Sequence, residues 1–282
     1  MIKAAVLGSP IEHSLSPVIH QRAYELLGWN WRYERYEVSS GQLKEFLAKY
    51  RGEFRGLSLT MPLKEEALNL IDNVSDLGKR VNGVNTLIFD ELQSRGENTD
   101  VQGFTDALTF HEIAIPKEVT VLGGGATARA AIAAVDGRAQ RVNVFSRSAH
   151  RTKALVNSAT HSIVTVFSWD DLTKNEMLAE NAASFGLKAD LVISTTPKGA
   201  TDQLDISGPS QTLFESLYNP WPTDLLRTWR DSGGFGIDGL DLLVWQAIGQ
   251  LELMALSGES LQEQKVELYQ EMRASALKFL AK

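Results

Sequence analysis

The stretch VTVLGGGATAR, residues 119–129, decides the fold of the central part of this chain. An apolar, strand-like run leads directly into Gly123 and Gly125, and Ala128 follows in a helix-like run, which gives the spacing G-x-G-x-x-G/A. The first glycine permits a tight turn, the second lets the backbone approach a pyrophosphate, and a small third residue allows close helix packing. The stretch predicts a dinucleotide-binding strand, turn and helix; the alternative is a glycine-rich turn kept for steric reasons alone.

Strand-like and helix-like runs alternate on both sides of this turn. Downstream, the order of the runs TARAAIAAV, RVNVFS, AHRTKALVNSA, IVTVFS and DLVIST predicts a doubly wound α/β domain. Upstream, residues 2–90 alternate in the same way and predict a second α/β unit, with a boundary near Val101 inside a helix expected over residues 100–110. Two long helix-like segments with a Ser-Gly break between them close the chain.

The composition is that of an ordinary globular protein. Of the 282 residues, 43% are hydrophobic and 22% are charged, which is enough apolar material for a sizeable core. The formal net charge of −7 provides no general field that attracts a phosphate backbone, so we expect no nucleic-acid partner.

Cysteine is absent, which excludes disulfides, thiol nucleophiles and thiolate metal sites. The five histidines stand at no ligand spacing, so we predict no metal site. No run approaches the roughly 20 apolar residues of a membrane span, and the first residues lack a secretory h-region. We therefore expect a cytoplasmic protein without a membrane partner.

The strand that follows the glycine turn indicates which dinucleotide is bound. An NAD site usually carries an acidic residue at this strand end to hold the ribose hydroxyls, whereas here the strand ends in Ser146-Arg147-Ser148, with Arg151 following. Two guanidinium groups and a hydroxyl suit a 2′-phosphate, so the sequence favours NADP. The alternative is a solvated basic start of the next helix, which the helix dipole slightly disfavours.

Polar residues of the first hundred positions form a second group of candidates. Each of them has an ordinary explanation when taken alone, as a helix cap, a turn residue or a surface charge. They are singled out because they occur together: Ser14, Ser16, Thr60, Lys64, Asn85 and Asp100.

At this point the chain closely resembles the shikimate dehydrogenase family. The family's patterns PIxHSxSPxxH, T-x-P-x-K, G-x-N-T, N-T-D-x-x-G, G-x-G-G-A-x-R-A, TP-x-G and G-x-x-x-L-V-x-Q occur in order. The matching segments, which extend over nearly the whole chain, are PIEHSLSPVIH, TMPLK, GVNT, NTDVQG, GGGATARA, TTPKGA and GLDLLVWQ.

The resemblance implies an activity and a domain arrangement. The activity is the reversible, NADP-dependent reduction of 3-dehydroshikimate to shikimate, an oxidoreductase step of chorismate and aromatic amino acid biosynthesis. We expect a substrate-binding catalytic domain from residues 1–101 with 239–282, to which the C-terminal helices return, and a Rossmann-type NADP-binding domain from residues 102–238. A monomer or homodimer is expected, with domain closure around a small-molecule substrate.

The resemblance also implies the site residues, position by position. The catalytic pair is Lys64 and Asp100, with Lys64 acting either as a proton carrier or as a cation that orients the reacting oxygen. The substrate residues are Ser14, Ser16, Thr60, Lys64, Asn85, Asp100, Tyr218 and Gln246. The cofactor residues are Gly123, Gly124, Gly125, Ala126, Ser146, Arg147, Ser148, Arg151, Thr195, Thr196, Pro197, Gly239 and Leu242.

Some positions depart from the family pattern, and two other functions stay open. Ser58, Gln21 and Ser146 stand where Asn is frequent, and Leu242 and Ala200 where Met is frequent. None of these departures removes a charged catalytic group, although they alter hydrogen bonds and the nicotinamide pocket.

The alternatives are a quinate/shikimate dehydrogenase, against which the arginine pair argues, and a noncatalytic NADP-binding regulator on the same fold.

Overall fold

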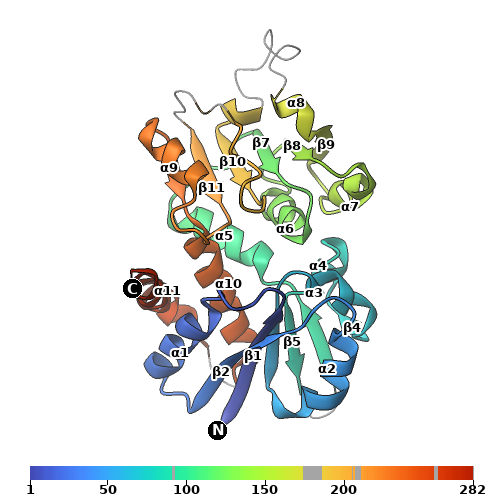
Figure 1. Ribbon diagram of the computed structural model, residues 1–282, viewed down its shortest axis with the longest axis vertical. Coiled ribbons are helices and arrows are strands. Elements are labelled where there is room, and N and C mark those ends of the chain that lie inside the picture. The colour runs from blue at the N-terminus through green and yellow to red at the C-terminus, as the bar shows by residue number, and fades with distance from the viewer. Residues whose placement is uncertain (91–92, 174–185, 205, 207–210, 257–259, 282) are drawn as a thin grey trace. The chain divides into compact units, whose positions relative to one another are not determined.

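The computed structural model describes residues 1–282 except 91–92, 174–185, 205, 207–210, 257–259 and 282 (Figure 1). The chain divides into two compact units, Met1–Gly103 with Leu243–Lys282, and Phe104–Leu242. Each unit contains a six-stranded sheet. No helix among the described residues is both long and apolar enough to cross a membrane.

The first unit is built on a mixed sheet with the strand order β2-β1-β3-β5-β6-β4. Its strands are β1 (Ile2–Gly8), β2 (Trp31–Glu37), β3 (Gly56–Leu59), β4 (Asn73–Val74), β5 (Thr86–Phe89) and β6 (Ser94–Glu97). The helices are α1 (Ser16–Leu27), α2 (Leu43–Tyr50), α3 (Leu63–Glu66), α4 (Asp76–Arg80) and α11 (Lys265–Leu280), together with the first turn of α5 (Asp100–Phe110) and most of α10 (Gly239–Met254). β1 pairs with β2 and β3 in parallel, whereas β5 pairs with β3 and β6 in antiparallel fashion.

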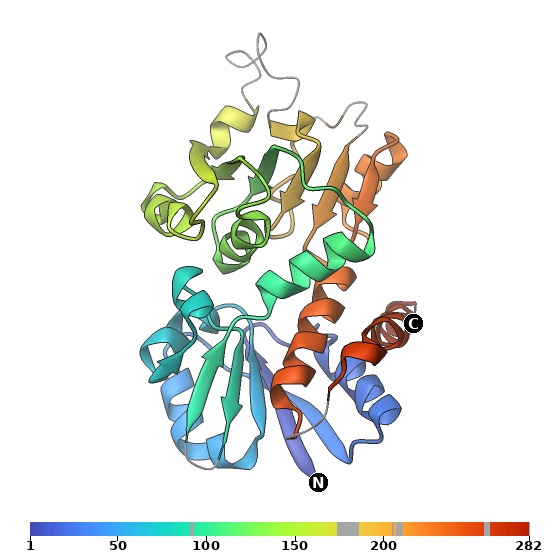
Figure 2. The same ribbon diagram turned by 180° about the vertical axis from the view of Figure 1, so that it is seen from behind.

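The alternation of side chains along β3 divides the core of this unit into two layers. Leu57 and Leu59 join one hydrophobic cluster with α2, through residues such as Leu43. Gly56 and Ser58 point the other way, where α10 lies: a Cβ at Gly56 would stand 2.6 Å from the Met254 methyl group. Glycine at this position leaves room for the Met254 side chain between helix and strand. Helix α11 lies beside α1, as both views show (Figures 1 and 2).

His20, on α1, is completely buried in this unit. Its ring stacks on Tyr33 with the centroids 3.9 Å apart, and its Nδ1 lies 2.9 Å from the Ser16 carbonyl oxygen. Burial lowers the pKa of His20 to about 4, from 6.5, and outweighs the opposing hydrogen bond to that carbonyl. The imidazole is therefore neutral in the folded protein at neutral pH.

We expect acid to destabilise the protein through this histidine. Between pH 6.5 and about 4 the unfolded chain binds one more proton than the folded chain at this position, so the free energy of unfolding falls as the pH falls. The expected loss between pH 7 and pH 5 is about 2 kcal/mol. Urea unfolding at the two pH values should show a smaller loss in His20→Gln than in wild type, whereas His150→Gln, which removes an exposed imidazole, should retain the wild-type loss. An unchanged loss in His20→Gln would contradict this assignment.

The second unit has an entirely parallel sheet with the order β12-β11-β10-β7-β8-β9. Its strands are β7 (Glu118–Leu122), β8 (Arg141–Ser146), β9 (Ile163–Ser168), β10 (Leu191–Ser194), β11 (Thr212–Glu215) and β12 (Phe235–Ile237). Its helices are the rest of α5, α6 (Ala126–Val135), α7 (Thr152–Val156), α8 (Trp169–Thr173), α9 (Asp224–Asp231) and the start of α10. The strand order reverses between β7 and β10, the position at which doubly wound sheets bind ligands. The predicted Rossmann-type fold is confirmed.

Candidate functional site

A largely buried ion pair joins Lys64 and Asp100 in the first unit. Lys64 Nζ donates a hydrogen bond to Asp100 Oδ2 at 2.6 Å, and the two side chains are 15% and 6% exposed. Lys64 lies on the short helix α3, shortly after β3, and Asp100 is the first residue of α5. Asn98 Oδ1 accepts hydrogen bonds from the backbone N–H groups of Asp100 and Val101, so the N-terminus of α5 is capped and the carboxylate is held there.

Asn85 completes the coordination of this carboxylate. Its Nδ2 donates to Asp100 Oδ1 at 2.8 Å, and its Oδ1 accepts the backbone N–H of Thr99 at 2.8 Å. Each oxygen of the Asp100 carboxylate thus receives one side-chain donor. Gln246 lies at the edge of the group, with its Oε1 at 3.5 Å from Asn85 Nδ2 and 3.4 Å from Thr99 Oγ1. Four of the sequence-predicted residues, Lys64, Asn85, Asp100 and Gln246, therefore come together.

Ser14, Ser16 and Thr60 lie at the same edge of the sheet as this group. β1 and β3 are parallel, so the loop after β1 that carries the serines and the residue Thr60 directly after β3 leave the sheet at one edge. β5 is antiparallel to β3, so its start lies at this edge too, where the Leu59 N–H donates to the Asn85 carbonyl oxygen at 2.7 Å. The Ser14 hydroxyl accepts the Ser16 N–H at 3.3 Å at the beginning of α1. The sheet topology therefore places the hydroxyl groups of Ser14, Ser16 and Thr60 at the same edge as the Lys64 ammonium group.

This arrangement suits proton transfer to or from an alcohol oxygen. An ammonium group has three N–H donors, and among the described residues Lys64 uses one of them, on Asp100. The remaining donors are available to a ligand oxygen, and the carboxylate keeps the ammonium in place. No group of three or more His, Asp or Glu side chains in the described part of the chain is arranged to hold a metal ion.

In the second unit, the glycine turn packs closely against Thr195, directly after β10, and against Ser146, at the end of β8. Gly123 has φ +118°, and a Cβ there would lie 2.4 Å from Thr195 Oγ1. A Cβ at Gly124 would lie 2.3 Å from Ser146 Oγ. Helix α6 begins at Ala126 with Gly125 as its N-cap and no side-chain cap, so its first N–H groups are available to an anion.

The end of β8 brings the basic residues to this turn. Because β8 is the parallel neighbour of β7, Ser146 lies beside the glycines. Arg151 Nη1 donates to the Gly124 carbonyl oxygen at 3.4 Å, and the Ser148 N–H donates to Ser146 Oγ at 3.2 Å. Arg147 and Arg151 are exposed, and no acidic residue stands at this strand end. The donors present fit the pyrophosphate and 2′-phosphate of NADP.

The remaining cofactor candidates lie directly after β10 and, following β12, at the start of α10. Thr195 donates to the Leu122 carbonyl oxygen at 2.9 Å, which links β10 to the glycine turn. A Cβ at Gly239 would lie 2.6 Å from the Leu217 carbonyl group, so only glycine fits where α10 begins against the segment that carries Tyr218. Leu242 is buried. Tyr218 belongs to the second unit, whereas the other substrate candidates belong to the first.

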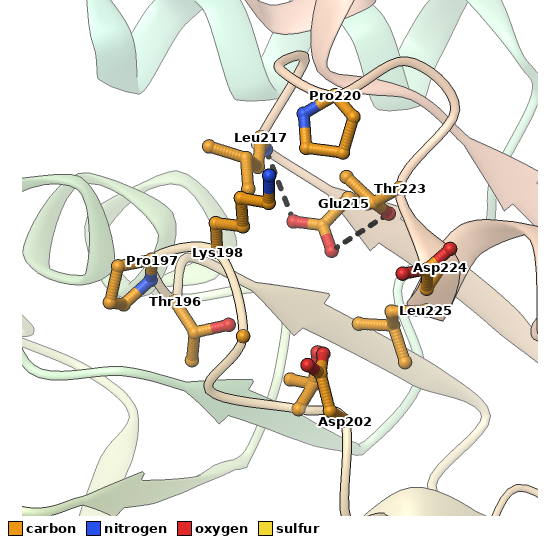
Figure 3. Close-up of a pocket in the computed structure, with 12 residues that line it drawn as sticks. Thr196, Pro197, Lys198, Asp202, Glu215, Leu217, Pro220, Thr223, Asp224 and Leu225 are labelled. Atoms are coloured by element: carbon orange, nitrogen blue, oxygen red, sulfur yellow. Dashed lines mark hydrogen bonds between the residues drawn. The ribbon is translucent and has the colours of Figure 1, made fainter.

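Glu215 is a polar residue of this region that the sequence did not single out. It is 2% exposed and lines a pocket with Thr196, Pro197 and Lys198 (Figure 3). Burial raises its pKa to about 7, against the opposing effect of its hydrogen bonds. Its oxygens accept the Leu217 N–H at 3.1 Å and the Thr223 hydroxyl at 3.5 Å, so it holds both ends of the loop that contains Tyr218. The only local signal is an acidic residue at the end of an apolar strand.

The chain is similar to known proteins over most of its length. The family model described as "Shikimate dehydrogenase substrate binding domain" matches residues 6–87. A Streptococcus pneumoniae (strain CGSP14) protein, named shikimate dehydrogenase (NADP(+)), is 32% identical over 259 residues, which cover 89% of this chain and 90% of that protein.

Solved structures are similar over almost the entire chain. The Thermus thermophilus shikimate 5-dehydrogenase in complex with NADP(H) and shikimate is 30% identical, with a TM-score of 0.81 and coverage of 99% of both chains. The Mycobacterium tuberculosis shikimate dehydrogenase is 29% identical, with a TM-score of 0.81 and coverage of 99% of this chain and 100% of that one.

Proposed function

The chain belongs to the shikimate dehydrogenase family, and from this we propose that it catalyses the reversible, NADP-dependent reduction of 3-dehydroshikimate to shikimate. This is an oxidoreductase reaction at a CH–OH group, in the biosynthesis of chorismate and the aromatic amino acids. The observation that carries the proposal is the hydrogen bond of Lys64 Nζ to an Asp100 carboxylate whose other oxygen is held by Asn85. A protein that only binds NADP has no chemical need for this arrangement.

Lys64 supplies the proton-transfer contact in the proposed mechanism. When the C=O group of 3-dehydroshikimate becomes C–OH, its carbon gains a hydride, which bound NADPH supplies, and its oxygen gains a proton. Lys64 Nζ donates a hydrogen bond to that oxygen and is the group that gives up or orients the proton. Asp100 keeps Nζ directed at the oxygen, and in the oxidative direction the same contact receives the proton.

The other substrate candidates hold the ring in place. Hydroxyl donors suit a carboxylate, so Ser14 and Ser16 are assigned to the carboxylate of the substrate. Thr60, Asn85 and Gln246 are assigned to its ring hydroxyls or carboxylate, which their position at one edge of the first sheet supports. Tyr218 is assigned to the lining of the same site. In the second unit, the turn at residues 123–126 and the basic residues after β8 are assigned to NADP.

Location and assembly form part of the same proposal. We propose a cytoplasmic protein, a monomer or homodimer, whose partners are small molecules. The net charge of −7 argues against a nucleic-acid partner.

A four-way assay tests substrate and cofactor together. The purified protein is given shikimate or quinate with NADP⁺ or NAD⁺, and reduced nicotinamide is followed by absorbance. We expect the highest kcat/KM with shikimate and NADP⁺. Preference for quinate or for NAD⁺ would overturn the substrate or the cofactor assignment, and absence of turnover with intact NADPH binding would indicate a regulator.

The guanidinium groups near the glycine turn should determine the cofactor preference. We expect Arg151→Gln to lower the preference for NADP⁺ over NAD⁺ by roughly tenfold, because a charge-assisted hydrogen bond contributes about 1.5–3 kcal/mol. The matched control is Arg141→Gln, at the opposite end of β8, where the arginine pairs with Glu118 at 2.9 Å. If Arg151→Gln and Arg141→Gln showed the same preference for NADP⁺ over NAD⁺, the assignment of Arg151 to the 2′-phosphate would be contradicted.

A further inference from the structure

A chain of buried hydrogen bonds begins behind the site, on the α10 face of the first sheet. The Tyr33 hydroxyl donates to Ser58 Oγ at 2.6 Å, and Ser58 Oγ donates to Gln250 Oε1 at 2.8 Å. Tyr33 and Ser58 are each 5% exposed and Gln250 is 1% exposed. With its oxygen occupied in this way, the Gln250 amide presents its Nε2 donors on the other side.

The chain continues from Gln250 to Asn85. Gln250 Nε2 donates to Thr86 Oγ1 at 3.1 Å and approaches the Asn85 carbonyl oxygen at 3.4 Å. The Thr86 hydroxyl in turn donates to Asn85 Oδ1 at 2.8 Å. Thr86 is fully buried and Asn85 is 1% exposed, so water does not compete for these bonds.

The contacts give a direction to each bond on the path from Tyr33 to Asn85. A hydroxyl group has one proton, and Thr86 receives the Gln250 N–H. Its own proton goes to Asn85 Oδ1 at 2.8 Å, because the other acceptor in reach, Thr99 Oγ1, is farther away at 3.5 Å. The backbone N–H of Thr99 also donates to that oxygen. The Thr99 hydroxyl is a third, longer donor to the same oxygen, at 3.3 Å. These donors hold the Asn85 amide with its oxygen turned inward and its Nδ2 turned toward Asp100.

The orientation of this amide matters because Asp100 is a buried carboxylate. With the amide in the observed orientation, an N–H group faces Asp100 Oδ1 at 2.8 Å. With the amide turned over, an oxygen would face the carboxylate, and repulsion would move Asp100 and the Lys64 ammonium bonded to it.

We propose that Gln250 and Thr86 are positioning residues for the reaction: they orient the Asn85 amide, which holds Asp100 and, through it, Lys64. This inference rests on the proposed function, since it assigns Lys64 and Asp100 to the chemistry. Neither residue is among the site residues that the sequence indicated. Ser58, which departs from the family pattern, serves here as the donor that orients the Gln250 amide.

The test compares nearly isosteric variants of Thr86. Thr86→Val removes the hydroxyl and keeps the shape, and Thr86→Ser keeps the hydroxyl. We expect Thr86→Val to lower kcat for shikimate oxidation by about tenfold, with a smaller change in KM, because misplacement of reacting groups lowers the rate of the chemical step. Thr86→Ser should retain most of the wild-type kcat. Thr120→Val is the matched control, because it removes a buried hydroxyl on β7 that has no hydrogen-bond partner among the described residues.

A double-mutant cycle tests whether Gln250 acts through Thr86. Gln250→Leu should lower kcat by a similar factor, and the double variant Gln250→Leu with Thr86→Val should be no slower than the slower single variant. Additive losses, or a kcat near the wild-type value in both single variants, would overturn the proposal.

A spectroscopic readout separates this inference from the proposed function. In protein labelled with ¹⁵N-asparagine, the side-chain amide signals of Asn85, assigned by their loss in Asn85→Asp, should shift in Thr86→Val and Gln250→Leu but not in Thr120→Val. If wild type fails to oxidise shikimate with NADP⁺, the proposed function is wrong, and these signals still report the positioning. If the Asn85 signals were unshifted in both Thr86→Val and Gln250→Leu, the positioning role of Thr86 and Gln250 would be refuted.

Discussion

Lys64→Ala is expected to lower kcat/KM for shikimate oxidation with NADP⁺ by about a thousandfold. The variant loses the donor that we assign to the reacting oxygen, and acid–base groups of this kind contribute about 10²- to 10⁴-fold. It also leaves the Asp100 carboxylate, whose side chain is 6% exposed, without its cation. Steady-state kinetics in both directions measure the effect.

Two controls separate lost chemistry from lost folding. Lys64→Met retains the alkyl stem and should lose activity to a similar extent, while thermal unfolding reports whether either variant is folded at the assay temperature. Lys49→Ala, at the exposed end of α2, should behave as wild type. If a folded Lys64→Met variant retained about a tenth of the wild-type kcat/KM, a central role for this ammonium in proton transfer would be wrong.

Gly123→Ala is expected to weaken NADPH binding by about a hundredfold. Gly123 has φ +118°, a conformation that costs a side-chain-bearing residue about 1–3 kcal/mol. A Cβ would also stand 2.4 Å from Thr195 Oγ1 and 3.2 Å from the Thr195 carbonyl oxygen, and we expect the turn to move away from β10. The moved turn would no longer direct its N–H groups and the start of α6 at the pyrophosphate. Fluorescence titration with NADPH measures the Kd.

The chain offers a control with similar backbone strain. Gly137 belongs to the same unit and has φ +77°, but a Cβ there would find no atom closer than 3.7 Å. Gly137→Ala should therefore lose stability without losing much NADPH affinity. Shikimate binding, measured by calorimetry, should be unchanged in both variants because the main substrate candidates lie in the first unit. Equal NADPH affinities in Gly123→Ala and Gly137→Ala would contradict the assignment of the turn.

The fold was predictable where local sequence has few structural solutions. The run of apolar residues into Gly123 and Gly125 fits a strand, a tight turn and a helix, and the structure has β7 and α6 there. The helix expected over residues 100–110 is α5, with the same bounds. The segment AHRTKALVNSA is only partly α-helical, since α7 covers Thr152–Val156 after a short 3-10 turn. The strand β5 lies in the strand-like run VNTLIF, but its antiparallel direction was not predicted, because strand direction depends on long-range pairing. The strand β6 was not predicted.

The sequence by itself determined the chemical groups of the candidate site. Lys64, Asn85, Asp100 and Gln246 were named from motifs, and the structure brings these four together. Each motif is a short run of residues, so it is visible in the sequence without the fold. A lysine beside a carboxylate also allows only a few kinds of chemistry. The glycine turn and the basic residues after β8 were likewise readable, because a backbone with positive φ and a strand end without an acid are local properties.

Only the tertiary structure decided how those groups are held. Ser58 and Gln250 are 192 positions apart, and Gln250 and Thr86 are 164 apart, yet each pair shares a hydrogen bond. Glu215 acquires its raised pKa from the residues that bury it. Hydrogen-bond direction and burial depend on which segments pack together, and that packing is a sum of many weak contacts over the whole chain, which no short stretch of sequence contains.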